Sequence, residues 1–101
     1  MERKMPLISI IIPFISWDGY REQCVSKCLK MDYRNFEIIL VPDTEIKNPF
    51  KDKRIKIAVS GKKNIPQKRN IGIKKAAKSS RYFAFIDSDA YPRKDWLSKA
   101  F

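Results

Sequence analysis

The alternation of strand and helix patterns is the feature of this sequence that most constrains its fold. Residues 7–12 and 36–41 form two nearly continuous apolar runs, which are typical of parallel strands covered on both faces. Residues 55–59 alternate in polarity and predict a third, less buried strand, and residues 82–86 predict a fourth, buried one. These four runs predict a single sheet.

Helical spacing separates the predicted strands. Apolar residues recur every three or four positions over 18–31, and Pro66 suits the first turn of a second helix that extends to residue 79. A third helix is predicted over 92–101. This order predicts an α/β fold with a mostly parallel four-stranded sheet and flanking helices, and right-handed crossovers favour the strand order 3-2-1-4. Residues 1–101 are enough for one domain.

Several chemically useful side chains follow the predicted strands. Phe14 comes after the first strand, Asp43 after the second, and Asp87, Ser88 and Asp89 after the fourth. In such sheets ligands bind outside the carboxyl ends of the strands, where the strand order reverses. We therefore expect three acids and an aromatic ring at one edge. The purely structural alternative is that Asp87 and Ser88 cap the helix that follows.

The positive charge of the chain is confined to one segment. Residues 51–81 hold twelve of the 22 Lys and Arg residues and a single acid, so this segment accounts for the whole net charge of +11. The excess predicts an anionic partner, which could be a nucleotide, a nucleic acid or a membrane surface. Part of it is explained by solvent alone, because Lys74, Lys75 and Lys78 fall on the polar side of the second helix.

Composition excludes several classes of protein. A hydrophobic content of 44% argues against a disordered chain, and no apolar run approaches the roughly 20 residues that span a bilayer. Cys24 and Cys28 are the two cysteines and there is no His, which argues against a closed zinc site and predicts two buried thiols on one helix face. We expect a cytoplasmic protein.

Four motifs resemble the amino-terminal half of a family 2 glycosyltransferase. They occupy residues 8–13, 35–43, 68–73 and 85–89, and they occur in the family's order and at its spacings over nearly the whole chain. The resemblance implies the Rossmann-like amino-terminal half of a GT-A fold that binds a nucleoside-diphosphate sugar. It also implies a divalent cation, Mg²⁺ or Mn²⁺, as cofactor.

The same resemblance implies roles for residues that contact the nucleoside. Pro13 and Phe14 would pack near the nucleoside, and Asp43 would read the base. A carboxylate can accept the imide N–H of uracil, so a UDP-sugar is favoured. Gly72 matches a small position where the helix lies close to the sheet.

Other residues match positions near the ribose and the diphosphate. Asp87 would lie by the ribose, Asp89 would ligate the metal with Asp87 as a second candidate ligand, and Ser88 stands between them. Lys68 and Arg69 match basic positions near the ribose and phosphates. Mg²⁺ needs few protein carboxylates, because phosphate oxygens and water complete its coordination.

The resemblance also defines what the chain lacks. No residue of this chain matches the family's catalytic base, which is expected beyond Phe101, so we expect a truncated enzyme that binds its donor but does not transfer sugar. The acceptor cannot be read from the sequence. A half-fold leaves a sheet edge exposed, which predicts self-association. Peripheral contact with the inner membrane surface is a further expectation from the basic segment.

Two other functional classes stay open at this point. A basic module that binds nucleic acid would explain the charge, but carboxylates at its binding edge would repel a phosphate backbone, so nucleic acid is not the favoured partner. A non-catalytic interaction or regulatory remnant would keep the fold and lose the ligand.

Overall fold

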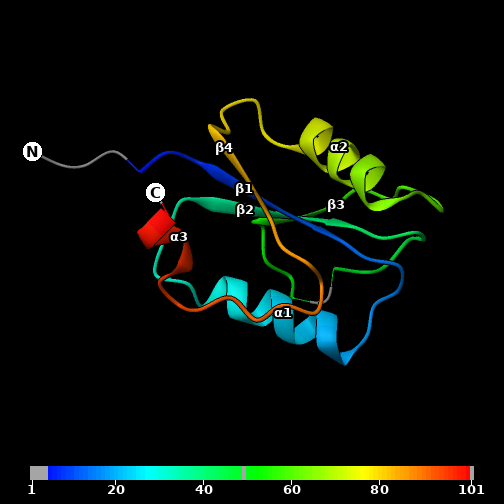
Figure 1. Ribbon diagram of the computed structural model, residues 1–101, viewed down its shortest axis with the longest axis horizontal. Coiled ribbons are helices and arrows are strands. Elements are labelled where there is room, and N and C mark those ends of the chain that lie inside the picture. The colour runs from blue at the N-terminus through cyan, green and yellow to red at the C-terminus, as the bar shows by residue number, and fades with distance from the viewer. Residues whose placement is uncertain (1–4, 49, 101) are drawn as a thin grey trace, which may run out of the picture.

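A single sheet of parallel strands organises the protein (Figure 1). The computed structural model describes residues 5–48 and 50–100. Within them the strands are β1 (Ile8–Pro13), β2 (Phe36–Val41), β3 (Ile55–Ile57) and β4 (Tyr82–Phe85). Their order is β3-β2-β1-β4 and all three pairings are parallel. The predicted order 3-2-1-4 is confirmed.

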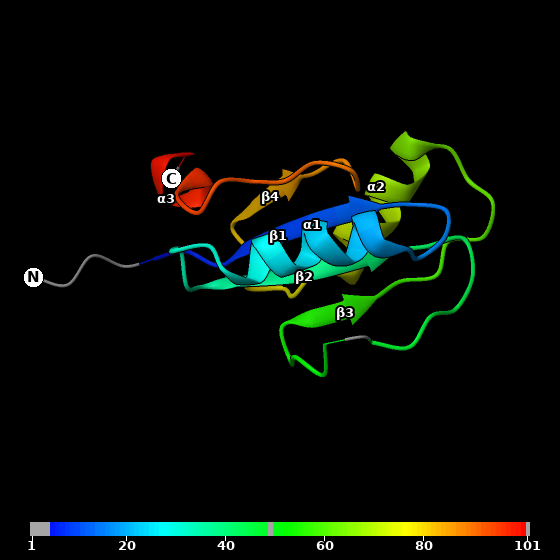
Figure 2. The same ribbon diagram turned by 90° about the horizontal axis from the view of Figure 1, so that it is seen from below.

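Two helices cover opposite faces of the sheet (Figure 2). Helix α1 (Gly19–Leu29) packs with its buried Cys24 and Cys28 against the face that carries Ile10, while α2 (Ile65–Lys75) lies on the face that carries Ile11. This division follows from the strand period of two residues. All six residues of β1 and all six of β2 are buried, as the apolar runs predict. The two thiols are buried, as predicted.

Helix α2 approaches the sheet closely at Gly72. A Cβ atom placed on Gly72 would lie 2.6 Å from Cγ2 of Ile11 and 3.3 Å from Cγ2 of Val41. Carbon atoms pack best at about 3.5–4.0 Å, so any side chain here would push the helix away. The small residue expected at this position therefore sets the distance between α2 and the ends of β1 and β2.

A buried carboxylate connects the end of α2 to the sheet. Glu37 of β2 accepts hydrogen bonds from the Ser9 hydroxyl at 2.5 Å and from the Ala77 N–H at 2.8 Å, and it pairs with Lys56 at 2.8 Å. Burial raises the pKa of Glu37, but the hydrogen bonds from Lys56, Ser9 and the Ala77 N–H together lower it below its ordinary value.

The predicted end of the second helix is wrong, and the hydrogen bonds of Glu37 explain why. Helix α2 ends at Lys75 instead of residue 79, and the carboxylate captures an N–H that a longer helix would have used internally. Lys74 and Lys75 are exposed as predicted, and Lys78 is exposed beyond the helix end.

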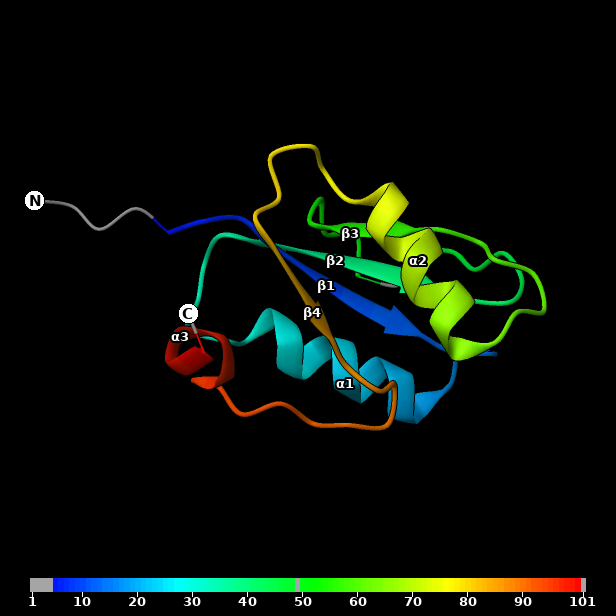
Figure 3. The ribbon, with the colours of Figure 1, turned by 45° about the horizontal axis from the view of Figure 1, so that its top comes forward.

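The fourth strand is less buried than predicted. Tyr82, Phe83 and Phe85 keep 46%, 40% and 40% of their surface exposed. In the described part of the chain β4 pairs with β1 alone, so it is an edge strand with one side uncovered (Figure 3).

The segment after β4 also differs from the prediction. Helix α3 spans Trp96–Ala100, shorter than the predicted 92–101, and Phe101 lies outside the described residues. Because α3 begins at Trp96, Asp87 and Ser88 do not cap it. None of the helices in residues 5–48 and 50–100 has the length and apolar character that crossing a bilayer requires.

Candidate functional site

The predicted site residues gather where the strands end. Because β1, β2 and β4 are parallel, the loops that follow them leave the sheet from one edge, and the amino end of α2 reaches the same edge (Figure 3). A capping box between Asn64 and Gln67 fixes this end of the helix. The next two residues, Lys68 and Arg69, lie beside the acids of two different loops.

Lys68 is buried at the centre of this edge. Its side chain is 2% exposed, and its Nζ lies 2.6 Å from Oδ1 of Asp43. The same Nζ donates to the carbonyl oxygens of Phe14 at 2.9 Å and Val41 at 3.2 Å and to Oγ of Ser60 at 2.9 Å. Lys68 therefore binds the protein itself, joining the ends of β1 and β2 to the loop after β3.

Arg69 lies on the other side of α2, beside the fourth strand. Its guanidinium stacks over the Phe85 ring at 5.2 Å from the centroid, and its terminal nitrogen lies 3.9 Å from Oδ1 of Asp87. The Arg69 and Asp87 side chains are 40% and 77% exposed. An exposed pair at this distance contributes little to stability, so both groups are available to a ligand.

Asp87, Ser88 and Asp89 form a turn closed by the Ala90 N–H, which donates to the Asp87 carbonyl oxygen at 2.9 Å. Asp87 and Asp89 are exposed and Ser88 is buried between them. The Cys24 thiol of α1 lies 3.9 Å from the same carbonyl oxygen. The turn thus rests on α1 and presents two carboxylates to solvent.

Aromatic rings support the loop after β1. Phe14 is 3% exposed and contacts Trp17 edge to face at 5.8 Å, and Trp17 contacts Phe50 at 6.3 Å. Pro13, the last residue of β1, is also buried. The Phe14 ring belongs to the core beneath the edge, whereas its carbonyl oxygen accepts from Lys68.

The three acids expected together are held in two groups. Lys68 pairs with Asp43, whereas Asp87 and Asp89 share the turn after β4. Among the described residues no three His, Cys, Asp or Glu side chains are placed to hold a metal ion together. The residues fit a cation only as a pair of exposed carboxylates whose other ligands come from phosphate and water, an arrangement that Mg²⁺ accepts.

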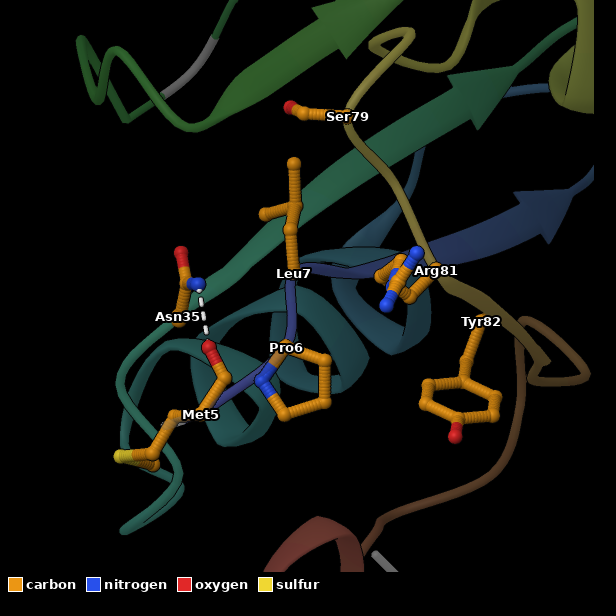
Figure 4. A pocket seen from close by; sticks show the side chains of 7 residues that line it. All are labelled: Met5, Pro6, Leu7, Asn35, Ser79, Arg81 and Tyr82. Carbon is orange, nitrogen blue, oxygen red and sulfur yellow. Dashed lines mark hydrogen bonds between the residues drawn. The ribbon is translucent and has the colours of Figure 1, made fainter. Parts of the chain in front are cut away.

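Hollows occur at the carboxyl ends and at the amino ends of the strands. One of about 270 Å³ includes Asp87, Phe85 and Trp96 in its lining. A larger one, of about 720 Å³, lies at the amino ends of β1 and β4 (Figure 4). Its lining contains no acid, and Asn35 there donates to the Met5 carbonyl oxygen. Size alone would favour the larger hollow, but the carboxyl edge is where parallel sheets bind ligands and where the acids lie.

Two residues of this edge escaped the sequence analysis. Ser60 accepts a hydrogen bond from Lys68, and the Arg69 guanidinium stacks over the Phe85 ring. The sequence contained a signal for Phe85: an aromatic residue at the end of an edge strand keeps part of its ring exposed, where another side chain can stack on it. Ser60 had none, since its role depends on a lysine eight residues further along the chain.

Comparisons with known proteins agree with this architecture. The family model described as Glycosyl transferase family 2 matches residues 9–101. An uncharacterized glycosyltransferase of Haemophilus influenzae is 39% identical over an alignment that covers 94% of this chain and 41% of that protein. GlyG of Streptococcus pneumoniae, a glycosyltransferase, is 33% identical over 82% of this chain and 30% of its own. The chain thus spans less than half the length of these relatives.

Solved structures share the fold. Residues 1–349 of S. aureus TarS in complex with UDP-GlcNAc superpose with a TM-score of 0.74 at 24% identity, covering 92% of this chain and 29% of that fragment. A second structure of the same TarS fragment gives a TM-score of 0.76 at 22% identity, over 92% of this chain and 30% of that one. The parallel sheet, the helices on its two faces and the family match lead to one conclusion: the chain belongs to glycosyl transferase family 2 and has the fold of the amino-terminal part of a GT-A domain.

Proposed function

We propose that this chain binds a nucleoside-diphosphate sugar, with a UDP-sugar favoured, as the donor-binding part of an inverting glycosyltransferase. One observation supports this above the others: adjacent residues of α2, Lys68 and Arg69, contact acids of two different loops, Asp43 and Asp87. In this proposal Asp43 reads the base and Arg69 binds the phosphates, on either side of the point where the strand order reverses.

The ligands and names of related proteins support the donor class. TarS has been solved with UDP-GlcNAc and with UDP. WfgD of Escherichia coli, 33% identical over 82% of this chain and 35% of its own length, is named a UDP-Glc:alpha-D-GlcNAc-diphosphoundecaprenol beta-1,3-glucosyltransferase. The TarS complexes contain a uridine nucleotide and the WfgD name specifies one, which agrees with a carboxylate at position 43.

Four residues at the carboxyl ends of the strands have a role in this proposal. Asp43 accepts the N3–H of the base, Arg69 neutralises the phosphates, and Asp87 lies by the ribose. Asp89 and Asp87 would hold Mg²⁺ or Mn²⁺. When bound, the metal supplies Lewis-acid stabilisation of the charge that grows on the departing nucleoside diphosphate.

Sugar transfer itself needs a further group. The acceptor oxygen bonds to the anomeric carbon as the bond from that carbon to the diphosphate oxygen breaks, and the acceptor's proton passes to a base. None of residues 1–101 matches the family's base. The 101-residue chain is therefore expected to bind donor without transferring sugar, and turnover onto an acceptor by this chain alone would contradict that part of the proposal.

Calorimetric titration of UDP and GDP, with and without Mn²⁺, tests the binding proposal. UDP is expected to bind more tightly than GDP, and Mn²⁺ to strengthen UDP binding. Asp89→Asn should weaken binding in Mn²⁺ by about tenfold or more, because it removes a charge-assisted contact worth about 1.5–3 kcal/mol. Asp32→Asn, at an exposed acid on a different loop, is the matched control.

Other outcomes would favour the alternatives. UDP affinity that neither Mn²⁺ nor Asp89→Asn alters would favour a non-catalytic remnant of the fold. Tight binding of random single-stranded DNA with a steep loss in salt would favour a nucleic-acid module, since many released counterions give a steep slope and one nucleotide gives a shallow one.

A further inference from the structure

The buried ammonium group of Lys68 is chemically unusual in this fold. A lysine side chain loses its hydration when it is fully buried, and that loss is tolerated only where acceptors replace the water. Here three oxygens accept hydrogen bonds from Nζ, those of the Phe14 and Val41 carbonyl groups and the Ser60 hydroxyl, and a carboxylate oxygen of Asp43 forms an ion pair with it at 2.6 Å. An ammonium has three hydrogens, so none is left for a ligand.

Lys68 also fixes which oxygen of Asp43 a ligand can reach. Oδ1 of Asp43 is fully buried, with Nζ of Lys68 at 2.6 Å. The Asp43 side chain as a whole is 19% exposed, so its exposed surface lies on atoms other than Oδ1. Oδ1 is thus paired within the protein, and Oδ2 is the oxygen left for a ligand.

The backbone around Asp43 is held as firmly as its side chain. Its N–H donates to the carbonyl oxygen of Ile15 at 3.3 Å, and its own carbonyl oxygen accepts from the Gly61 N–H at 3.1 Å. Gly61 has a φ of +74°, a conformation that glycine adopts readily. The Ser60 N–H donates to the Pro42 carbonyl oxygen at 2.9 Å, so the loops after β2 and β3 are fastened together around Lys68.

We propose that Lys68 is a positioning residue for base selection: by holding Oδ1 of Asp43 it points the other oxygen at the nucleobase and favours uracil over cytosine. This inference rests on the proposed function. Uracil presents an N3–H that a fixed carboxylate oxygen accepts, whereas cytosine presents a lone pair at N3 that the same oxygen repels. A carboxylate free to rotate would lose much of that discrimination.

The test is the ratio of UDP to CDP affinity in Lys68→Met, which is one atom shorter, keeps an unbranched apolar side chain and removes the charge. UDP affinity is expected to fall by about tenfold, because Oδ1 of Asp43 loses its ion-pair partner and the carboxyl group is free to turn, while CDP affinity changes less. The ratio of UDP to CDP affinity therefore narrows. Lys74→Met, at an exposed lysine of the same helix, should leave both affinities unchanged.

A second background shows whether Lys68 acts through Asp43. In Asp43→Ala, where discrimination is already lost, adding Lys68→Met should produce no further change in the ratio. Circular dichroism checks that each variant is folded. If Lys68→Met does not fold, Lys68→Gln replaces it, because its amide keeps a donor beside Asp43 and predicts an intermediate narrowing.

The outcomes separate the two proposals. A folded Lys68→Met or Lys68→Gln with the unchanged UDP to CDP ratio would overturn the role of Lys68 and leave nucleotide binding standing. If the unaltered protein binds no UDP, both the proposed function and the role of Lys68 are overturned. Loss of stability without loss of discrimination would show that Lys68 only supports the fold.

Discussion

Substituting Gly72 by Ala tests the seating of the helix that carries both basic site residues. The new Cβ atom would lie 2.6 Å from Cγ2 and 3.2 Å from Cγ1 of Ile11, and 3.3 Å from Cγ2 of Val41. Ile11 and Val41 are both 0% exposed, and β-branched side chains have few alternative rotamers. The strain therefore falls on the position of α2 relative to the sheet.

The expected magnitude follows from two opposing effects. Overpacking a core costs about 1–3 kcal/mol, and a first contact about 1 Å inside the optimal separation belongs in the upper half of that range. Replacing Gly by Ala within a helix raises the free energy of unfolding by about 1 kcal/mol, because Ala has the higher helix propensity. The free energy of unfolding should fall by about 1–2 kcal/mol, which corresponds to a Tm lower by about 4–16 °C in a domain of this size.

Urea denaturation followed by circular dichroism measures this change. Gly19→Ala is the matched control, because nothing lies within 4 Å of a Cβ placed on Gly19, the first residue of α1. The same chemical change there should stabilise the protein by about 0.4–1 kcal/mol. The reasoning is refuted if Gly72→Ala is as stable as the unaltered protein, or if the two substitutions shift stability in the same direction.

Two further predictions concern the ends and edge of the sheet. Because the pKa of Glu37 is lowered on folding, its ionised form stabilises the protein above the ordinary carboxyl pKa of 4.5, and that contribution is lost as the pH falls through the lowered value. The stability difference between the unaltered protein and Glu37→Gln should therefore shrink from about pH 7 to about pH 3; a constant difference across that range would contradict this. On the edge strand β4, Phe83→Lys should reduce concentration-dependent self-association measured by sedimentation velocity, because a charge on an edge strand opposes strand pairing. Ile15→Lys, at an exposed apolar position away from β4, should leave self-association unchanged. Equal effects of the two substitutions would count against pairing through β4.

Part of this architecture was predictable because it depends on local patterns. Residues 36–41 are apolar at every position except Glu37, and such a run is buried on both faces only when the strand lies between two covering layers. Right-handed crossovers then fixed the strand order. The same topology predicted that Asp43 and Asp87 would leave the sheet from one edge.

What the sequence could not provide depends on contacts between distant segments. The family resemblance singles out Lys68 as a basic position near the phosphates, but no local pattern predicts that its side chain is buried. Its carbonyl partner Phe14 lies 54 residues away. The end of α2 was also misplaced, because the Ala77 N–H is captured by Glu37 from 40 residues earlier. In both cases tertiary hydrogen bonds override the local pattern.

The spacing between Lys68 and Gly72 has a consequence for how relatives of this chain can vary in length. Both are buried and lie four positions apart on α2, which places them one helical turn apart on the face toward the sheet. A single insertion between them would rotate the basic pair by about 100° away from its acids. Homologues should accept added or deleted residues between β2 and β3, and almost none within this one turn.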